Sequence, residues 1–319
     1  MFSDSKLIFI DLISGESGRK APCGLVIAIG NFDGVHLGHR KLIETAVNTA
    51  QELKAAGEKV EGGVFCFSEP PADHLLESPP AHICSLEKKL EIFRELGAKY
   101  AVIGDFLRLK DVEAEDFCEL LENECNCRGI VCGFNFRFGR GRKGNSETLK
   151  NIFGVKAEII EAITTDDGMP VSSSRIRALI KEGDIVQANR LLGHPFSIEG
   201  AVLHGKALGR QLGLPTVNQN FMKNTMIPKN GIYVSAVISG GKRFPAVTNI
   251  GFRPTVEEQG KLNCETHLLD FEGELYGEKI SVELLCRLRD EKKFASEAEL
   301  KAAIEGDIQM ARKYFSEKK

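Results

Sequence analysis

One ten-residue segment, GNFDGVHLGH at residues 30–39, constrains the fold of this chain more than any other. It directly follows a short apolar run, GLVIAI at residues 24–29, and precedes residues 41–56, whose apolar side chains recur at helical spacing. A continuously apolar strand that ends in a glycine-rich turn before an amphipathic helix is typical of a buried parallel sheet. The segment therefore predicts a strand–turn–helix unit whose turn lies at the carboxyl end of the strand.

The rest of the first half repeats this alternation. Strand–helix alternation implies an α/β fold with a doubly wound parallel sheet, in which ligands bind at the carboxyl ends of the strands. The sequence predicts strands at 24–29, 63–67, 100–103, 129–132 and 156–161, and helices at 41–56, 86–96 and 112–121.

The hydrophobic pattern of the sequence changes after residue 192. Residues 172–192 are helical in pattern, with a break into two helices at Gly183 and Asp184. Short alternating runs then follow, most of them separated by turns that carry glycine or proline, and this pattern favours a small antiparallel barrel or a sandwich. We therefore expect two domains, 1–192 and 193–319. The predicted strands of the second are 196–203, 231–238, 243–250, 263–269 and 280–288, and an amphipathic helix runs from 297 to about 314.

Composition narrows the function classes. A net charge of −3 gives no general attraction to nucleic acid or to anionic membranes, so any phosphate site must be local. No apolar run approaches the roughly 20 residues that cross a bilayer, and the first residues lack the features of a signal peptide. We expect a cytoplasmic protein that binds neither membrane nor nucleic acid. The nine cysteines are scattered, without zinc-site spacing, and are expected to be reduced thiols.

The first candidate site is the segment 30–39 itself. Its glycines permit tight turns and close approach of a ligand, and the following helix start favours anions. His36 and His39 are three residues apart, so both imidazoles can donate hydrogen bonds to phosphate oxygens. The ending Gly-Lys-Ser/Thr of a Walker A loop is absent. Two solvent-exposed histidines, or a metal site, are the alternatives at this stage.

Two later segments of the first half also suit a nucleotide. Ser174 and Arg175, in VSSSRIR at 171–177, open a predicted helix, where hydroxyl groups, helix amides and a guanidinium can hold a phosphate. A simple serine cap with solvated arginines is the alternative. Asn135 lies in CGFNFRFGRGRKGN at 132–145, a loop that can stack a planar ring and contact phosphates, or else form a basic nucleic-acid patch or a flexible loop.

The second candidate site combines a glycine-rich segment with an acidic strand. The segment 205–218, GKALGRQLGLPTVN, offers a phosphate-binding loop through Gly205, Lys206, Gly209 and Arg210. Thr216 and Asn218 supply neutral oxygens that suit Mg²⁺. Glu265 is the candidate base that takes a proton from an alcohol attacking a γ-phosphoryl group. A glycine-rich hairpin loop and a solvated or ion-paired glutamate are the respective alternatives.

GNFDGVHLGH resembles the HxGH signature of the nucleotidylyltransferase superfamily. Together with GFNFRFGRGRKGN and SSSRIR, it resembles the N-terminal module of the bacterial bifunctional riboflavin kinase/FAD synthetase family. This resemblance implies adenylyl transfer from ATP to FMN, with His36 and His39 on the phosphates and Ser174 and Arg175 in a second phosphate-binding element. The ATP-binding residues it implies in this module are Gly30, Asn31, Phe32, Gly34, His36, Gly38, His39, Asn135, Ser174 and Arg175.

The second half is similar to the riboflavin kinase module of the same family. The similarity rests on PTVN at 215–218, NIGFRPT at 249–255, ETHLLDFEGELYG at 265–277 and LRDEKKF at 288–294. It implies a six-stranded antiparallel barrel with a C-terminal helix, Thr216 and Asn218 as ligands of Mg·ATP, and Glu265 as the base for the ribityl hydroxyl. Arg289 would lie on a flap that closes over the flavin, and Phe294 would contact the flavin as well.

One departure from the family pattern concerns the first module. Where the family has a histidine after its second strand, this chain has Pro70, in CFSEPP at 66–71, and His74 is the nearest substitute.

Three alternatives to the bifunctional enzyme stay open. These are a riboflavin kinase without effective adenylylation, an adenylyltransferase for another small substrate, and a flavin- or RNA-binding regulator. The expected small-molecule partners are riboflavin, FMN and ATP, and the sequence leaves homo-oligomerisation open.

Overall fold

The computed structural model describes residues 7–12, 21–203, 216–252 and 262–318. The chain divides into two compact units: residues 1–80 with 85–172, and residues 81–84 with 173–319. The expected boundary near residue 192 places the two helices of 173–192 with the first domain, whereas this division places them with the second unit.

The first unit is built on a six-stranded sheet in the order β1-β4-β3-β2-β5-β8, in which every strand pairing is parallel. From β2, the chain adds strands first on one side and then, with β5, on the other. The switch therefore lies between β2 and β5, where ligands bind in such sheets. The parallel α/β fold expected from the sequence is confirmed. The strands are β1 (Ile8–Asp11), β2 (Gly24–Ile29), β3 (Val60–Phe67), β4 (Tyr100–Gly104), β5 (Cys127–Gly133) and β8 (Ala157–Ile160).

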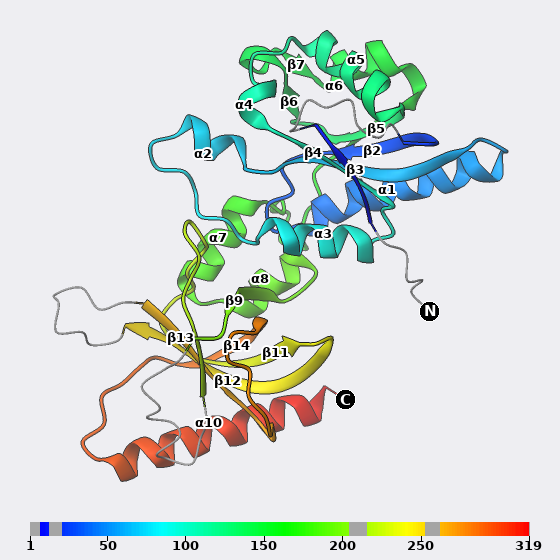
Figure 1. Cartoon of the computed structure of the whole chain (residues 1–319). Coiled ribbons are helices and arrows are strands. Elements are labelled where there is room, and N and C mark those ends of the chain that lie inside the picture. The colour runs from blue at the N-terminus through cyan, green and yellow to red at the C-terminus, as the bar shows by residue number, and fades with distance from the viewer. Residues whose placement is uncertain (1–6, 13–20, 204–215, 253–261, 319) are drawn as a thin grey trace. The chain divides into compact units, whose positions relative to one another are not determined.

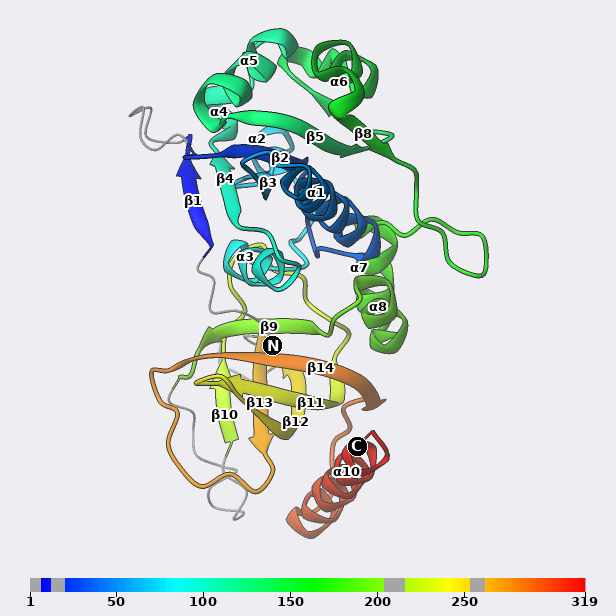
Figure 2. The same ribbon diagram turned by 90° about the vertical axis from the view of Figure 1, so that its right-hand side faces the viewer.

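Helices cover both faces of this sheet. In Figures 1 and 2, α1 (Leu37–Ala55) and α3 (Leu86–Glu95) lie on one face, and α5 (Ala114–Cys125) and α6 (Ser146–Phe153) lie on the other. Helix α1 buries the apolar stripe that its sequence spacing predicts, including Leu42, Ile43 and Ala46. Burial of both sheet faces explains why β2 is apolar at every position.

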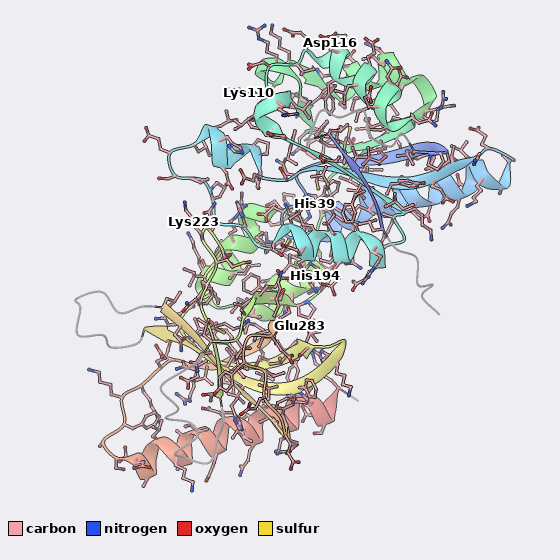
Figure 3. All side chains as sticks on the ribbon, viewed as in Figure 1. His39, Lys110, Asp116, His194, Lys223 and Glu283 are labelled. Atoms are coloured by element: carbon pink, nitrogen blue, oxygen red, sulfur yellow. The ribbon has the colours of Figure 1, made fainter. Side chains whose placement is uncertain are left out.

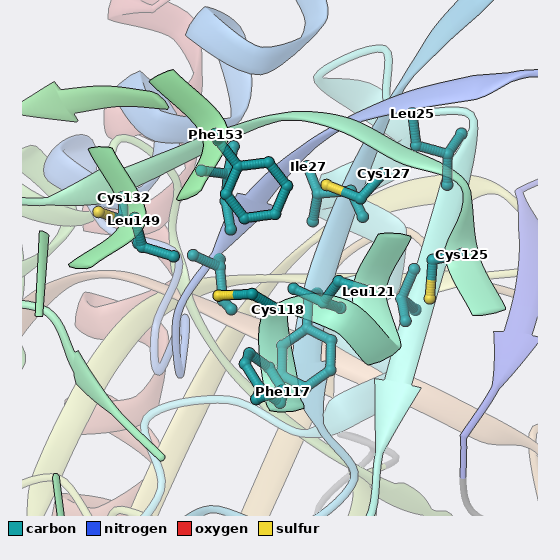
Figure 4. Close-up of a cluster of buried hydrophobic side chains, with 14 of the residues drawn as sticks. Leu25, Ile27, Phe117, Cys118, Leu121, Cys125, Cys127, Cys132, Leu149 and Phe153 are labelled. Atoms are coloured by element: carbon teal, nitrogen blue, oxygen red, sulfur yellow. The ribbon is translucent and has the colours of Figure 1, made fainter. Parts of the chain in front are cut away.

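Several cysteine side chains lie in the core between the sheet and the second helical layer. Figure 4 shows the thiols of Cys118, Cys125, Cys127 and Cys132 among leucine and phenylalanine side chains. Burial raises the pKa of Cys118, Cys125 and Cys132 to about 12 each, so these thiols stay protonated at neutral pH. All nine cysteines of the chain are free, as expected, and they pack as small apolar side chains.

The second unit contains a six-stranded antiparallel sheet in the order β10-β13-β12-β11-β14-β9. A bridge between Leu203 and Asn218 joins the region after β9 to β10, so the two edges of the sheet meet and the sheet curls into a barrel. The barrel and the C-terminal helix implied by the family resemblance are thus both present. The strands are β9 (Phe196–Ala201), β10 (Thr216–Gln219), β11 (Gly231–Ser239), β12 (Lys242–Phe252), β13 (Leu262–Leu268) and β14 (Lys279–Arg289).

Among the described residues of the second unit, three helices accompany the sheet. The predicted break at Gly183 separates α7 (Ser173–Glu182) from α8 (Ile185–Leu192). Gly183 has a φ of 85°, and an added Cβ would lie 2.8 Å from Arg287 Cδ, so a side chain is disfavoured here for two reasons. The C-terminal helix α10 (Glu297–Glu317) packs on β11 and β12 through Ala311 and Ile308 (Figure 1).

Several short elements differ from the sequence expectations. The sequence did not predict β1, β10, α6, α2 (Pro71–Leu75) or α4 (Phe106–Leu109). Each is eight residues or shorter, so hydrophobic periodicity has little length over which to appear. The strand expected at 196–203 ends at Ala201, and the helix expected at 112–121 runs instead from Ala114 to Cys125. The small strands β6 (Arg137–Phe138) and β7 (Gly144–Asn145) form a separate ribbon.

Two candidate active sites

The loop that follows β2 has a tightly specified backbone. Phe32 and Val35 take positive φ angles of 51° and 39°, which are uncommon for residues other than glycine, and both side chains are fully buried. A hydrogen bond of 3.1 Å from the Val35 N–H to the Phe32 carbonyl closes the turn, in which Gly34 has a φ of 78°. Backbone strain of this kind persists only where the surroundings hold it, and it is frequent at functional sites.

His36 has a structural task that also sets its chemistry. It is the N-cap of α1, and its Nδ1 accepts a hydrogen bond of 3.3 Å from the backbone N–H of His39. In the neutral ring the proton therefore lies on Nε2, which is the nitrogen free to donate to a ligand. The imidazole of His39, which is labelled in Figure 3, stacks on that of His36 at 3.6 Å between ring centroids. An added Cβ on Gly38 would lie 3.2 Å from the His36 ring, so glycine keeps this space open.

Both histidines are neutral at physiological pH. Burial lowers the pKa of His36 to about 4, although its own backbone acts in the opposite direction. Burial, together with the neighbouring His36 and Lys89, lowers the pKa of His39 well below its usual value. The Nδ1 of His39 is shielded and has no hydrogen-bond partner among the described residues. The pair is thus suited to donate neutral hydrogen bonds to phosphate oxygens at the start of a helix.

The other residues expected in the first site have mixed positions. Gly30 and Asn31 lie in the same loop, directly after β2. Asn135 is exposed in the turn after β5, the strand on the far side of the switch point. Ser174 and Arg175 lie in the first turn of α7, in the second unit. Their participation in ATP binding stays a prediction.

Pro70 and His74 lie just beyond the carboxyl end of β3. Pro70 is the N-cap residue of α2 and makes no side-chain cap hydrogen bond. His74 follows one turn later, where its Nε2 lies 3.0 Å from Glu69 Oε2 and its ring stacks on Phe106 at 5.8 Å between centroids. Phe106 is the first residue of α4 and follows Asp105, the N-cap residue between β4 and this helix. The His74 imidazole therefore lies at the carboxyl edge of the sheet, as does the loop after β2.

The second candidate site is assembled across β10 and β13. The register places Asn218 opposite Glu265 and Thr216 opposite His267. The Thr216 hydroxyl donates a hydrogen bond of 2.7 Å to Glu265 Oε1, and the Asn263 amide donates one of 3.1 Å to Asn218 Oδ1. The structure therefore brings together the three residues that the sequence proposed as metal ligands and base.

One further polar residue extends this row. Asn249 on β12 lies opposite Glu265, so the cross-strand order is Asn218, Glu265 and Asn249. The Asn249 Oδ1 is shielded and has no hydrogen-bond partner among the described residues. The sequence placed Asn249 in a family motif but gave it no role. Its alternation on β12, in register with Glu265, would have identified it once the strand pairing was known.

Arg289 lies in the same cross-strand row as Asn249 and Glu265, because the register pairs it with Ile232 on β11 and pairs Ile232 with Asn249. Arg289 is the last residue of β14, and its guanidinium binds both carboxylate oxygens of the buried Asp307 on α10, at 3.0 and 2.7 Å. The guanidinium carbon also lies 5.9 Å from the centre of the Phe294 ring. The expected contacts of both residues with a flavin stay predictions. Gly205, Lys206, Gly209 and Arg210 lie outside the described residues.

A metal ion fits the second site better than the first. Within the described ranges, no cluster of three histidine, cysteine, aspartate or glutamate side chains could hold an ion. Mg²⁺, however, binds few protein ligands and prefers hard oxygens, which Thr216, Asn218 and Glu265 offer side by side. The Thr216 hydroxyl uses its proton for Glu265 and retains its oxygen lone pairs, so its hydrogen bond does not compete with metal coordination.

Across the described part of the chain, no helix reaches both the length and the apolar character needed to cross a bilayer.

Comparison with known proteins covers both units. Residues 18–175 match the FAD synthetase family, and residues 192–315 match the riboflavin kinase family. The chain is 36% identical over 293 residues to a bifunctional riboflavin kinase/FMN adenylyltransferase of Pseudomonas fluorescens, covering 91% of this chain and 92% of the relative. Relatives with the same description occur in Bacillus subtilis, at 35% identity over 91% of this chain and 92% of the relative, and in Escherichia coli, at 36% over 92% and 93%.

A solved structure is similar along nearly the whole chain. It is the crystal structure of a Streptococcus pneumoniae protein described as a macrolide-efflux protein, with a TM-score of 0.84 and 30% identity over 96% of this chain and 99% of that one. The efflux description concerns that protein. The matched families and the relatives that span both units agree with each other and with the two assembled sites, and the chain belongs to the bifunctional riboflavin kinase/FMN adenylyltransferase family.

Proposed function

We propose that the chain carries out two ATP-dependent reactions in series. Riboflavin is phosphorylated to FMN in the barrel, and FMN is adenylylated to FAD, with release of pyrophosphate, in the parallel α/β unit. The observation that carries this proposal is that the two matched families divide one chain between them and that each match contains an assembled site: His36 with His39, and Thr216 with Glu265. The division into domains 1–192 and 193–319 and a cytoplasmic location are kept as proposals.

In the kinase reaction, Glu265 acts as the base. Its Oε1 is occupied by the Thr216 hydroxyl, so Oε2 is the oxygen that accepts the proton of the ribityl alcohol. The alcohol oxygen then attacks the γ-phosphorus of ATP, and ADP leaves. Thr216 and Asn218 would hold Mg²⁺, which neutralises phosphate charge and orients the transferred group.

In the adenylyl transfer, a phosphate oxygen of FMN attacks the α-phosphorus of ATP, and the bond to the β-phosphate breaks. Negative charge grows on the leaving pyrophosphate. The neutral His36 donates from Nε2, because Nδ1 is bound by the backbone N–H of His39. The first-turn amides of α1 add further donors to the same anion.

One assay tests the proposal. The protein is incubated with riboflavin, ATP and Mg²⁺, and then with FMN, ATP and Mg²⁺, and the flavins are separated by chromatography. FAD in both incubations is the expected result. FMN without FAD would support a riboflavin kinase with an ineffective adenylyltransferase unit, the alternative that Pro70 favours. Absence of both products would contradict both functions.

A further inference from the structure

A lysine beneath the loop 30–39 has no role in the functions described so far. Lys89 and Phe93 lie one turn apart on the buried face of α3. Phe93 packs edge-on against Phe32 at 5.3 Å between ring centroids, and the Lys89 Nζ donates a hydrogen bond of 3.1 Å to the Asn31 carbonyl. Two successive residues of the loop, Asn31 and Phe32, are thus held by two buried residues of α3 that lie one turn apart.

The surroundings of this ammonium group are unusual. Lys89 is only 4% exposed, and within the described residues its Nζ makes that one hydrogen bond and no ion pair. Lysine is rarely this buried unless it is paired, and its ammonium has three protons to donate. The adjacent Lys88 shows the usual arrangement, since it is 9% exposed and its Nζ lies 3.0 Å from Glu91 Oε2.

The loop also lacks another fixed positive charge among its own residues. His36 and His39 are neutral, and the sequence of 30–39 contains Asp33 but no lysine or arginine. A nucleoside triphosphate is strongly anionic, and the pyrophosphate group gains negative charge as it leaves. The positive charge of Lys89 already acts on this loop, because it helps to lower the pKa of His39.

We propose that Lys89 is a positioning residue of the adenylyltransferase site, which holds the loop through Asn31 and supplies the fixed positive charge under its phosphate-binding surface. The proposal rests on the adenylyl transfer proposed above. It assigns the two parts of anion binding to different residues. The neutral histidines and helix amides provide directed hydrogen bonds, and Lys89 provides charge from the side of the loop that faces α3.

Three variants separate charge from shape. Lys89→Gln keeps an N–H donor for the Asn31 carbonyl but removes the charge, Lys89→Arg keeps the charge, and Lys88→Gln is a matched change one residue away. We expect Lys89→Gln to lower kcat/KM for ATP in FAD formation about a hundredfold, mainly through KM, and Lys89→Arg to recover at least about tenfold of that loss. Lys88→Gln should stay within about twofold of the unchanged protein. Riboflavin phosphorylation, measured on the same samples, should be unchanged in all three.

A second measurement does not depend on adenylyl transfer. The pKa of His39 is followed by NMR in histidine-labelled protein, with its signal assigned by its loss in His39→Ala. Removal of the Lys89 charge should raise this pKa in Lys89→Gln, whereas Lys88→Gln should leave it unchanged. The dispersion of the histidine signals also shows whether each variant is folded.

Clear outcomes oppose the proposal. It is overturned if folded Lys89→Gln forms FAD as efficiently as the unchanged protein, if Lys89→Arg is as impaired as Lys89→Gln, or if the His39 pKa does not respond to Lys89→Gln. If the unchanged protein forms no FAD while the His39 pKa still responds, adenylyl transfer is wrong and the electrostatic assignment of Lys89 stands.

Discussion

The Thr216 hydroxyl donates a hydrogen bond of 2.7 Å to Glu265 Oε1 across the neighbouring strands β10 and β13. This contact joins a residue that sequence reasoning assigned to the metal with the residue that it assigned to proton transfer. Because Thr216 fixes one carboxylate oxygen, the second oxygen is directed by the same bond. With the roles proposed for Thr216 and Glu265, metal binding and base orientation would be coupled through this hydrogen bond.

The first prediction concerns the base. Glu265→Gln keeps an oxygen that can accept from Thr216 but removes the group that takes the proton. We expect FMN formation to fall by about a thousandfold, in the range of general-base catalysis, whereas conversion of added FMN to FAD should be preserved. Both rates are measured by chromatography of the flavins.

Glu283→Gln is the control for this change. Glu283 (labelled in Figure 3) is on β14 of the same sheet and pairs with Arg243 at 3.0 Å, away from β10 and β13. It should form FMN at the usual rate. Equal loss in both variants would show that the sheet, rather than the base, had been damaged, and loss of both activities in a folded Glu265→Gln protein would contradict two separate sites.

The second prediction concerns the stacked histidines. Replacing both His36 and His39 by alanine removes the two imidazoles and the N-cap acceptor of α1. We expect FAD formation to fall by at least about a thousandfold, because loss of a single donor of this kind costs about a hundredfold or more. FMN formation should continue. Steady-state assays with riboflavin and with FMN test the two activities separately.

His36→Asn refines that experiment. Asparagine is a good N-cap residue, so this variant should keep the start of α1 while losing the imidazole donor. If His36→Asn formed FAD at the usual rate, the cap alone would be what the reaction requires from this position.

Much of the fold could be predicted because its long elements have clear periodicity. The sequence predicted both the apolar strand β2 and the break between two helices at Gly183. Strand β10 could not be predicted from the sequence, because Thr216–Gln219 is only four residues long and follows a glycine-rich segment that is typical of a loop. Its strand character depends on pairing with β13, which is a distant interaction that local pattern does not record.

The sites show the same limit. His36 and His39 lie three residues apart in the sequence, so their proximity was predictable. The pairing of Thr216 with Glu265 rested on a family resemblance until the register was known. Lys89 had no local signal, since its position next to Lys88 on α3 resembles a solvated helix face. Its burial depends on the packing of α3 against the loop 30–39.

The third prediction concerns acid stability. A histidine in the unfolded chain has a pKa of about 6.5, whereas His36 in the folded protein has a pKa of about 4. Between these values the unfolded chain binds a proton that the folded chain does not, so acid favours unfolding. The free energy of unfolding is not reduced by His36 above about pH 6.5 and falls as the pH drops toward 4. The reduction that His36 causes is about 2 kcal/mol at pH 5.

Urea unfolding followed through NMR signals of the first unit measures this effect. The free energy of unfolding should decrease from pH 7 to pH 5, and the decrease should be smaller by about 2 kcal/mol in His36→Asn, which has no group that titrates in this range. Identical pH dependence in the two proteins would contradict a neutral, buried His36.

The fourth prediction concerns Asp307. Its carboxylate is 3% exposed and receives two hydrogen bonds from Arg289, which joins the end of β14 to α10. Asp307→Asn keeps the shape but removes the charge and leaves the guanidinium without its ionic partner. We expect the free energy of unfolding of the barrel to fall by about 3 kcal/mol, because one partner of a buried ion pair is then uncompensated. Arg289 would also lose the contact that fixes it beside Phe294, so KM for riboflavin should rise more than kcat falls if both residues contact the flavin.

Asp270→Asn is the matched control, because Asp270 also accepts two hydrogen bonds from an arginine of α10, Arg312, but this pair is exposed at the surface. Exposed pairs contribute at most about 1 kcal/mol, so this variant should unfold close to the urea concentration of the unchanged protein and should keep its KM for riboflavin. A barrel that is equally stable in Asp307→Asn and Asp270→Asn would show that burial adds nothing to the Arg289 pair. A lowered stability with an unchanged KM would instead assign Asp307 to the packing of α10 alone, and would separate Arg289 from the flavin.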